Sequence, residues 1–233
     1  MSAVDRNDRA ALVGWFDTVA HYHFNNSDWL ARALVHRSAG RDNNERLEFL
    51  GDAVLDTVIS HRLLLQRSAA DEGELSRLRS VLVRKSSLAT ISEQLGVDQY
   101  LSLGPGERKS GGHRRASVLA DTLEALLGAV FMDGGYSSAE QVIDRWFATA
   151  LQTLPAAAAL KDPKTRLQEW LQHRSAPLPS YRVIAVSGAA HEQNFDVECL
   201  LVDRQRAFTA TGSSRRKAEQ RAASAALEYL EGE

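Results

Sequence analysis

Apolar residues recur at spacings of three and four over the first two-thirds of the chain, and this period predicts a series of amphipathic helices. The strongest stripe lies within residues 43–66 and predicts a long, mostly buried helix. Its apolar members are Leu47, Leu50, Val54, Leu55, Val58, Ile59 and Leu63. The same spacing predicts helices over residues 12–19, 29–34, 74–95, 117–132 and 137–154. We therefore expect an all-α domain here.

The pattern changes after a small-residue linker around residues 154–160. A short amphipathic helix around Leu167 is followed by residues 181–185 and 195–201, where apolar positions alternate as they do in half-buried strands. A third strand is predicted around Phe208 and Ala210, and a last helix after Gly212. This order, α-β-β-β-α, indicates a small α+β domain. Two domains are thus predicted, at residues 8–152 and 162–232, joined by a linker at 153–161.

Composition and charge narrow the possible classes of protein. The hydrophobic share of 44% and the charged share of 25% are those of a globular chain. The longest apolar run, residues 126–132, is far shorter than the ~20 residues that span a bilayer, and no signal peptide is evident. We expect a soluble cytoplasmic protein without a membrane partner. A net charge of −2 argues against a generic nucleic-acid binder, so local patches would have to hold a polyanion.

The single cysteine and the glycine-rich segment exclude two further kinds of site. Cys199 has no partner for an intrachain disulfide or a cysteine metal cluster, and we expect it in the core of the second domain. Residues 103–112 suggest a phosphate-binding loop, but Arg108 stands where that motif requires glycine. We predict a flexible loop between helices there. His36 is predicted to make a structural hydrogen bond within its helix.

Carboxylates carry the candidate chemistry of the first domain. The spacing i, i+3, i+7 places three on one helix face, i, i+3 places two on a later helix, and one begins another helix. These residues are, in that order, Glu45, Glu48 and Asp52, then Asp121 and Glu124, then Glu72. A solvated face is the simpler explanation for any one of them. The set, however, is embedded in apolar sequence with few Lys or Arg at matching positions, and all-oxygen ligands suit Mg²⁺ or Mn²⁺.

The segment Asn44-Glu-Arg-Leu-Glu-Phe-Leu-Gly-Asp52 resembles the signature of bacterial ribonuclease III, an endonuclease that cuts double-stranded RNA. Residues 36–38, 71–76, 103–112 and 120–126 extend the resemblance. It implies a helical nuclease domain that works as a homodimer and needs Mg²⁺, with Mn²⁺ as a substitute.

The resemblance also implies roles for single residues. The implied metal ligands are Glu48, Asp52, Asp121 and Glu124, of which Asp52 and Glu124 would be catalytic together with Glu45 and Glu72. The last two would support a second metal ion, or the water and phosphate around it. Phe49 would insert into a pocket of the partner subunit. An ordinary core position for Phe49 predicts the same burial, so that alternative stays open.

Three cations, Arg215, Arg216 and Lys217, open the last predicted helix, where the helix dipole disfavours positive side chains. Such a helix start is a good receptor for phosphate. The whole domain resembles the double-stranded-RNA-binding domain. That resemblance implies that these cations hold phosphates across a major groove and that other residues face the two flanking minor grooves. The implied minor-groove residues are Thr165, Gln168, Glu169 and His191.

The two resemblances imply an Mg²⁺-dependent endoribonuclease that cuts double-stranded RNA to 5′-phosphate and 3′-hydroxyl ends, processing ribosomal RNA precursors and other structured transcripts. A non-catalytic binder of double-stranded RNA is a second hypothesis, which the complete set of six carboxylates argues against. A metal-dependent hydrolase of DNA or small phosphates is a third, which the second domain argues against.

Overall fold

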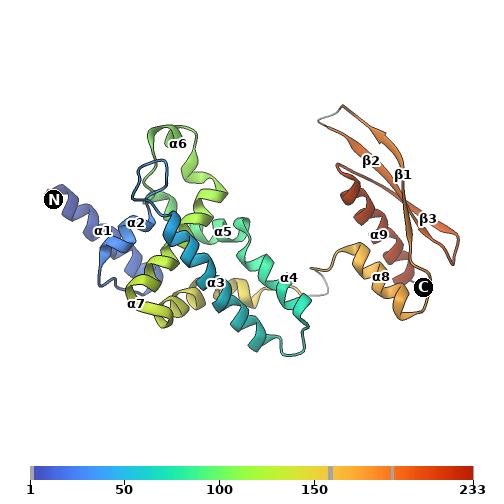
Figure 1. Cartoon of the computed structure of the whole chain (residues 1–233), viewed down its shortest axis with the longest axis horizontal. Coiled ribbons are helices and arrows are strands. Elements are labelled where there is room, and N and C mark those ends of the chain that lie inside the picture. The colour runs from blue at the N-terminus through green and yellow to red at the C-terminus, as the bar shows by residue number, and fades with distance from the viewer. Residues whose placement is uncertain (1–2, 157–159, 190–191, 233) are drawn as a thin grey trace. The chain divides into compact units, whose positions relative to one another are not determined.

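A computed structural model describes residues 3–156, 160–189 and 192–232 of the chain (Figure 1). The chain divides into two compact units, residues 1–157 and 158–233. The first is helical and the second combines helices with a sheet, as the two sequence rhythms predicted (Figure 1).

The first unit is built from α-helices and two short 3₁₀ turns. The elements are α1 (Ala3–Ala20), α2 (Ser27–Ala33), α3 (Glu45–Gln66), α4 (Glu72–Val83), α5 (Lys85–Leu95), a 3₁₀ turn at Val97–Gln99, α6 (Pro105–Lys109), a 3₁₀ turn at Gly112–Arg114, and α7 (Ala116–Gln152). The two helices predicted over 117–132 and 137–154 form the single run α7. Gly135 interrupts it with a non-helical conformation (φ 74°, ψ −173°), so the predicted break exists as a kink.

Two other predictions for this unit were wrong in detail. The helix predicted over 74–95 is two helices, because Arg84 is extended (φ −66°, ψ 149°) and ends α4 while it begins α5. The segment 103–112, predicted as a loop, contains α6. Pro105 occupies the first turn of α6 after an extended Gly104, which is a favoured helix start that apolar periodicity does not reveal.

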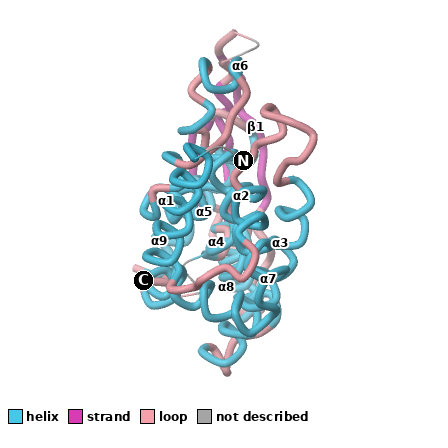
Figure 2. The backbone as a smooth tube through the Cα atoms, turned by 90° about the vertical axis from the view of Figure 1, so that its left-hand side faces the viewer, coloured by secondary structure: helices cyan, strands magenta, loops and turns pink. Residues whose placement is uncertain are grey.

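Helix α7 packs against α3, and two glycines permit their close approach (Figures 1 and 2). A Cβ atom on Gly51 of α3 would lie 1.7 Å from the carbonyl oxygen of Glu124. A Cβ atom on Gly128 of α7 would lie 2.1 Å from the carbonyl oxygen of Leu47. Neither position accepts a larger residue without separating the helices. The polar residues of α3 and α7 that flank this contact are therefore brought close to one another.

The second unit places a sheet against two helices. Its elements are α8 (Pro163–His173), β1 (Ser180–Ser187), β2 (Asn194–Leu201), β3 (Arg206–Gly212) and α9 (Arg215–Glu231). The strands form an antiparallel sheet in the order β1-β2-β3, in which Cys199 pairs with Tyr181 on one side and Phe208 on the other. The predicted α-β-β-β-α order is confirmed.

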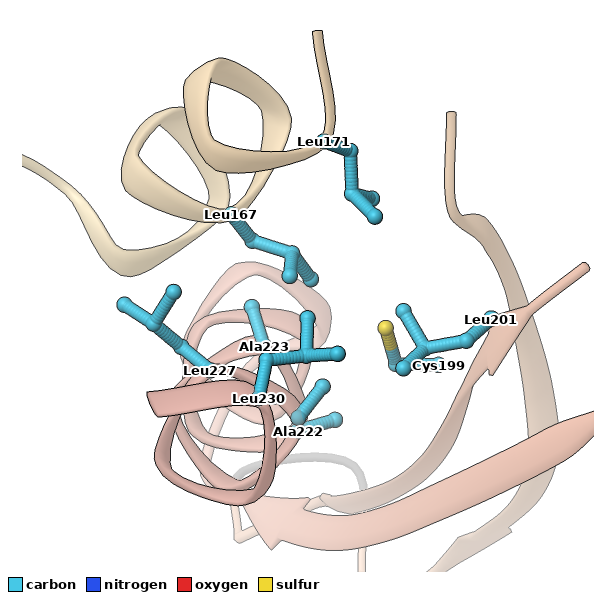
Figure 3. Packing of buried hydrophobic residues seen from close by; sticks show 9 residues of the cluster. Leu167, Leu171, Cys199, Leu201, Ala222, Ala223, Leu227 and Leu230 are labelled. Atoms are coloured by element: carbon cyan, nitrogen blue, oxygen red, sulfur yellow. The ribbon is translucent and has the colours of Figure 1, made fainter. Parts of the chain in front are cut away.

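The core of this unit lies between the sheet and the helices α8 and α9 (Figure 3). Leu167 and Leu171 of α8 face Cys199 and Leu201 of β2, and all four are fully buried. Small residues on α9, such as Ala222, let its backbone lie close to the sheet. The predicted core position of Cys199 is confirmed.

Candidate metal centre and RNA-binding surfaces

Three carboxylates from two helices meet where α3 packs against α7. Glu48 comes from α3, and Asp121 and Glu124 come from the beginning of α7. One ligand oxygen of each lies within 4.8 Å of the other two, and all three residues are half-buried. The i, i+3 spacing places two of them on one face of α7. The contact at Gly51 and Gly128 brings the third opposite them.

Burial and like charges raise the pKa of two members of this carboxylate cluster. Burial, followed by the negative charges of Asp52, Asp121 and Glu48, raises the pKa of Glu124 from 4.5 to about 8. Burial, followed by the charge of Asp121, also raises the pKa of Glu48. The charged forms therefore cost free energy here, and a bound cation would relieve that cost.

Lys85, the first residue of α5, supplies a cation that the spacing did not predict. Its Nζ donates a hydrogen bond to Asp121 Oδ1 at 3.1 Å, and this bond raises the pKa of Lys85. The expectation that the carboxylates have few Lys or Arg partners was incomplete, because Lys85 comes from a third helix. One exposed ammonium does not balance three carboxylates. The hard oxygen donors at this spacing therefore still fit a divalent ion such as Mg²⁺ or Mn²⁺.

The carboxylate cluster lines a cavity of about 990 Å³ in the first unit. The cavity is also lined by cations that motif spacing did not indicate, because they come from separate segments: Arg37, Arg84, Lys85 and Arg115. Glu107 of α6 lines it as well, and its Oε1 lies 2.7 Å from a guanidinium nitrogen of Arg115. Acidic and basic side chains thus share one cavity. That combination suits a polyanion held beside a metal ion.

The other three predicted carboxylates lie differently. Asp52 is exposed and lines the same cavity, but its carboxylate does not belong to the group formed by Glu48, Asp121 and Glu124. Glu45 also lines the cavity, with Oε1 3.7 Å from a guanidinium nitrogen of Arg37. Glu72 begins α4, accepts a hydrogen bond from Ser76 Oγ at 2.8 Å, and is not among the described lining residues. One cavity therefore brings together five of the six predicted carboxylates.

Phe49 is not a core residue. Its side chain on α3 is 81% exposed, so the alternative of an ordinary core position is wrong. It lines a second cavity of about 510 Å³, together with Trp29, Leu50 and the exposed Met132. Exposed large apolar side chains beside such a cavity mark a surface for protein contact.

His36 lies beyond the end of α2, not within a helix as predicted. Its Nδ1 is 2.8 Å from Ser38 Oγ, and that oxygen accepts a hydrogen bond from the backbone N–H of Gly104 at 2.9 Å. A Cβ atom on Gly104 would lie 2.2 Å from the carbonyl oxygen of Ser38. The predicted structural hydrogen bond of His36 exists, and it ties this segment to the one that carries α6.

In the second unit, the start of α8 presents predicted RNA contacts. Thr165 and Gln168 are exposed and lie three residues apart, hence on one face. Glu169 is half-buried, and its carboxylate lies 2.8 Å from Lys161 Nζ. His191 lies outside the described residues.

The start of α9 presents the predicted phosphate contacts. Arg215, Arg216 and Lys217 are all exposed. Ser214 caps the helix, since its Oγ accepts a hydrogen bond from the backbone N–H of Lys217 at 3.3 Å. Serine is a preferred residue at this position, and the cap orients the first turn.

Both units match known families. The family described as "Ribonuclease-III-like" matches residues 26–151, and the family described as "Double-stranded RNA binding motif" matches residues 163–230. Ribonuclease 3 of Photorhabdus laumondii subsp. laumondii is 50% identical over 210 residues, which cover 90% of this chain and 93% of that protein. Ribonuclease 3 of Pasteurella multocida is 48% identical over 210 residues, which again cover 90% of this chain and 93% of that protein.

The first unit also resembles solved structures of the ribonuclease III nuclease domain from Campylobacter jejuni. One superposes with a TM-score of 0.58 at 34% identity, covering 61% of this chain and 98% of that chain. Another, with a TM-score of 0.57 at 36% identity, covers 59% of this chain and 96% of that chain and is described as flexible in a region involved in dimer formation.

The chain therefore belongs to the ribonuclease III family. It is an endoribonuclease with a domain that binds double-stranded RNA. No helix among the described residues is both long and apolar enough to cross a membrane.

Proposed function

We propose that the chain hydrolyses phosphodiester bonds of double-stranded RNA in an Mg²⁺-dependent reaction that leaves 5′-phosphate and 3′-hydroxyl ends, with Mn²⁺ as a substitute. The observation that carries this proposal is the meeting of Glu48, Asp121 and Glu124 beside Asp52 in one cavity. A bound Mg²⁺ would lower the pKa of a water molecule and neutralise charge on phosphate oxygens. Glu48, Asp52, Asp121 and Glu124 would hold the ion.

The remaining groups of the cavity would orient the RNA. Arg37 and Arg115, which line the cavity, would pair with a phosphodiester, and Glu45 would orient water beside it. We assign the same supporting role to Glu72, which would act from outside the cavity lining. The rival route, attack by the RNA 2′-hydroxyl, calls for a pair of histidines as acid and base. Among the described lining residues His36 is the single histidine, and Ser38 engages its Nδ1.

We further propose that the enzyme is a homodimer in which Phe49 enters a pocket of the partner subunit. Its 81% exposure and the adjacent cavity lined by Leu50 and Met132 support this role. Burying a phenylalanine contributes about 1.5–3 kcal/mol, and a symmetric dimer would bury two.

The second unit would hold the duplex by its shape. Thr165, Gln168 and Glu169 of α8 would face one minor groove, with His191 at the next, and Arg215, Arg216 and Lys217 of α9 would bind phosphates between them. A-form RNA displays 2′-hydroxyls in a shallow minor groove, so recognition of this kind is largely independent of sequence. The substrates we propose are ribosomal RNA precursors and other structured transcripts, bound by residues 162–232 and cut by residues 8–152.

The test uses end-labelled duplex RNA, the separate single strands and duplex DNA, with and without Mg²⁺, resolved on a denaturing gel. We expect cleavage of the RNA duplex alone, only with metal, and with 5′-phosphate ends. Glu124→Ala should abolish cleavage and retain binding, whereas Glu93→Ala, which removes an exposed carboxylate of α5, should leave both unchanged. If the protein binds the RNA duplex but leaves it uncut with both Mg²⁺ and Mn²⁺, it is a non-catalytic binder of double-stranded RNA. Normal turnover by Glu124→Ala would refute the metal assignment.

A further inference from the structure

A buried carboxylate joins the starts of the two helices in the second unit. Glu219, in the second turn of α9, is only 9% exposed. Its Oε2 accepts a hydrogen bond from Lys164 Nζ of α8 at 2.7 Å, and its Oε1 accepts one from Arg215 Nε at 2.9 Å. A buried charge is stable only when it is paired, and this one has two cationic partners from different helices.

Lys164 is held on a second side. Its Nζ lies 4.2 Å from the centroid of the Tyr181 ring on β1, within the range of a cation–π interaction. Its backbone N–H donates to Asp162 Oδ1 at 2.9 Å, and the side-chain amide of Gln220 on α9 donates to the other oxygen of Asp162. The start of α8 is therefore fixed to both β1 and α9.

Arg215 is held as well, because Glu219 lies one turn further along α9 and engages its guanidinium. The neighbouring cations are less restrained. A guanidinium nitrogen of Arg216 lies 3.9 Å from Asp162, and Lys217 Nζ donates to Ser213 Oγ at 3.3 Å. Glu219 thus restrains one of the three predicted phosphate contacts directly. Through Lys164 it also restrains the segment that carries Thr165.

We propose that Glu219 is a positioning residue for duplex RNA: its carboxylate sets the spacing between the minor-groove face of α8 and the phosphate-binding start of α9. The inference depends on the proposed RNA-binding surfaces. Because A-form RNA is recognised by shape, two surfaces that contact neighbouring grooves must keep a set separation. A preformed separation removes the cost of ordering flexible side chains upon binding.

Simple electrostatics predicts the opposite sign. Glu219 is buried, but its negative charge lies beside Arg215, which is on the surface that would meet a polyanion. If that charge acted only by repulsion, its removal would strengthen RNA binding. Positioning predicts that its removal weakens binding, although the protein becomes more positive. The direction of the change therefore separates the two roles.

The experiment compares Glu219→Gln with Glu228→Gln in the full chain. Glu228 is exposed on the same helix, so its replacement makes the same change of charge without touching the contacts that Glu219 makes with Lys164 and Arg215. Binding of a fluorescent RNA duplex is measured by anisotropy in EDTA, which prevents cleavage, over a series of salt concentrations. We expect Glu219→Gln to weaken binding about tenfold, as when one or two long side chains are freed. Glu228→Gln should stay within about twofold of the parent chain.

The salt dependence and a double-mutant cycle distinguish positioning from loss of folding. Glu219→Gln should make the plot of log K against log salt concentration less steep by about 0.9, which corresponds to the loss of one phosphate contact. Its effect should become smaller in a chain that already carries Arg215→Ala, and the part that remains should come from the contact of Glu219 with Lys164. Glu219→Asp, which keeps the charge, should recover part of the affinity. Each variant is first shown to be folded at the assay temperature by its thermal unfolding curve.

Two kinds of failure are distinguishable. Tighter binding by Glu219→Gln, or a loss that is fully additive with Arg215→Ala, would refute the positioning role. Lys217→Ala tests the underlying surface separately, and we expect it to weaken binding at moderate salt. If Lys217→Ala binds like the parent chain, the proposed phosphate contacts of α9 are wrong whatever Glu219 does.

Discussion

Replacing Glu124 by glutamine should stabilise the metal-free protein at alkaline pH although it destroys the metal site. Burial and the neighbouring Asp52, Asp121 and Glu48 raise the pKa of Glu124 from 4.5 to about 8. A carboxyl whose pKa is higher in the folded chain favours folding while it is protonated. That contribution is present below pH 4.5 and is lost as the pH rises towards 8. Glutamine resembles the protonated form at every pH.

The magnitude follows from the shift in pKa. At about 1.36 kcal/mol per unit the full shift is close to 5 kcal/mol, but partial exposure and coupling among the carboxylates reduce this to about 1–2 kcal/mol. For a unit of this size we expect Glu124→Gln to raise the melting temperature by about 3–6 °C at pH 9. The gain should shrink to almost nothing at pH 4.5.

The assay is thermal unfolding in EDTA from pH 4.5 to 9, followed by tryptophan fluorescence. Glu93→Gln is the control, because it removes the same charge from an exposed position on α5. A gain of equal size at pH 4.5 and pH 9 would show that it does not come from the charge of Glu124. A loss of stability at pH 9 would refute the reasoning altogether.

Three further changes test the geometry of the first unit. Lys85→Met removes the ammonium from Asp121 and should tighten Mn²⁺ binding, measured by calorimetry, up to about fivefold, which corresponds to the free energy of an exposed ion pair. Unchanged affinity would mean that Lys85 does not compete with the metal ion for Asp121. Phe49→Asp should give a monomer in sedimentation, while Leu65→Asp, at another exposed apolar site of α3, should not. Gly128→Ala should cost about 3 kcal/mol in chemical denaturation, because its Cβ atom would lie 2.1 Å from a carbonyl oxygen. Gly14→Ala, with open space around it, should not destabilise the chain.

Much of the fold follows from local pattern. Helical periodicity predicted α3 within 43–66, and alternation predicted the strands with Cys199 in the core, because burial of one face imposes a period on the residues that share it. The pattern failed at Arg84, where one residue changes conformation within a continuous helical period. It also failed at α6, a helix without a buried residue. Neither feature leaves a trace in the apolar spacing.

The candidate metal site was likewise predictable from the sequence only in part. Spacing grouped Glu45, Glu48 and Asp52 on one helix, because residues three, four and seven apart share a face. That these meet Asp121 and Glu124 depends on how closely α3 and α7 approach. No spacing along the chain reports a distance between two helices.

The sequence by itself determined which residue types are available for chemistry and which face of each element they occupy, since both follow from side-chain identity and backbone period. Only the tertiary structure decided what surrounds each of them. It brought Lys85 to the carboxylates, left Phe49 exposed and buried Glu219 between two cations. The physical reason is that charge, desolvation and contact depend on distances through space. Packing sets those distances between segments that are far apart in the chain.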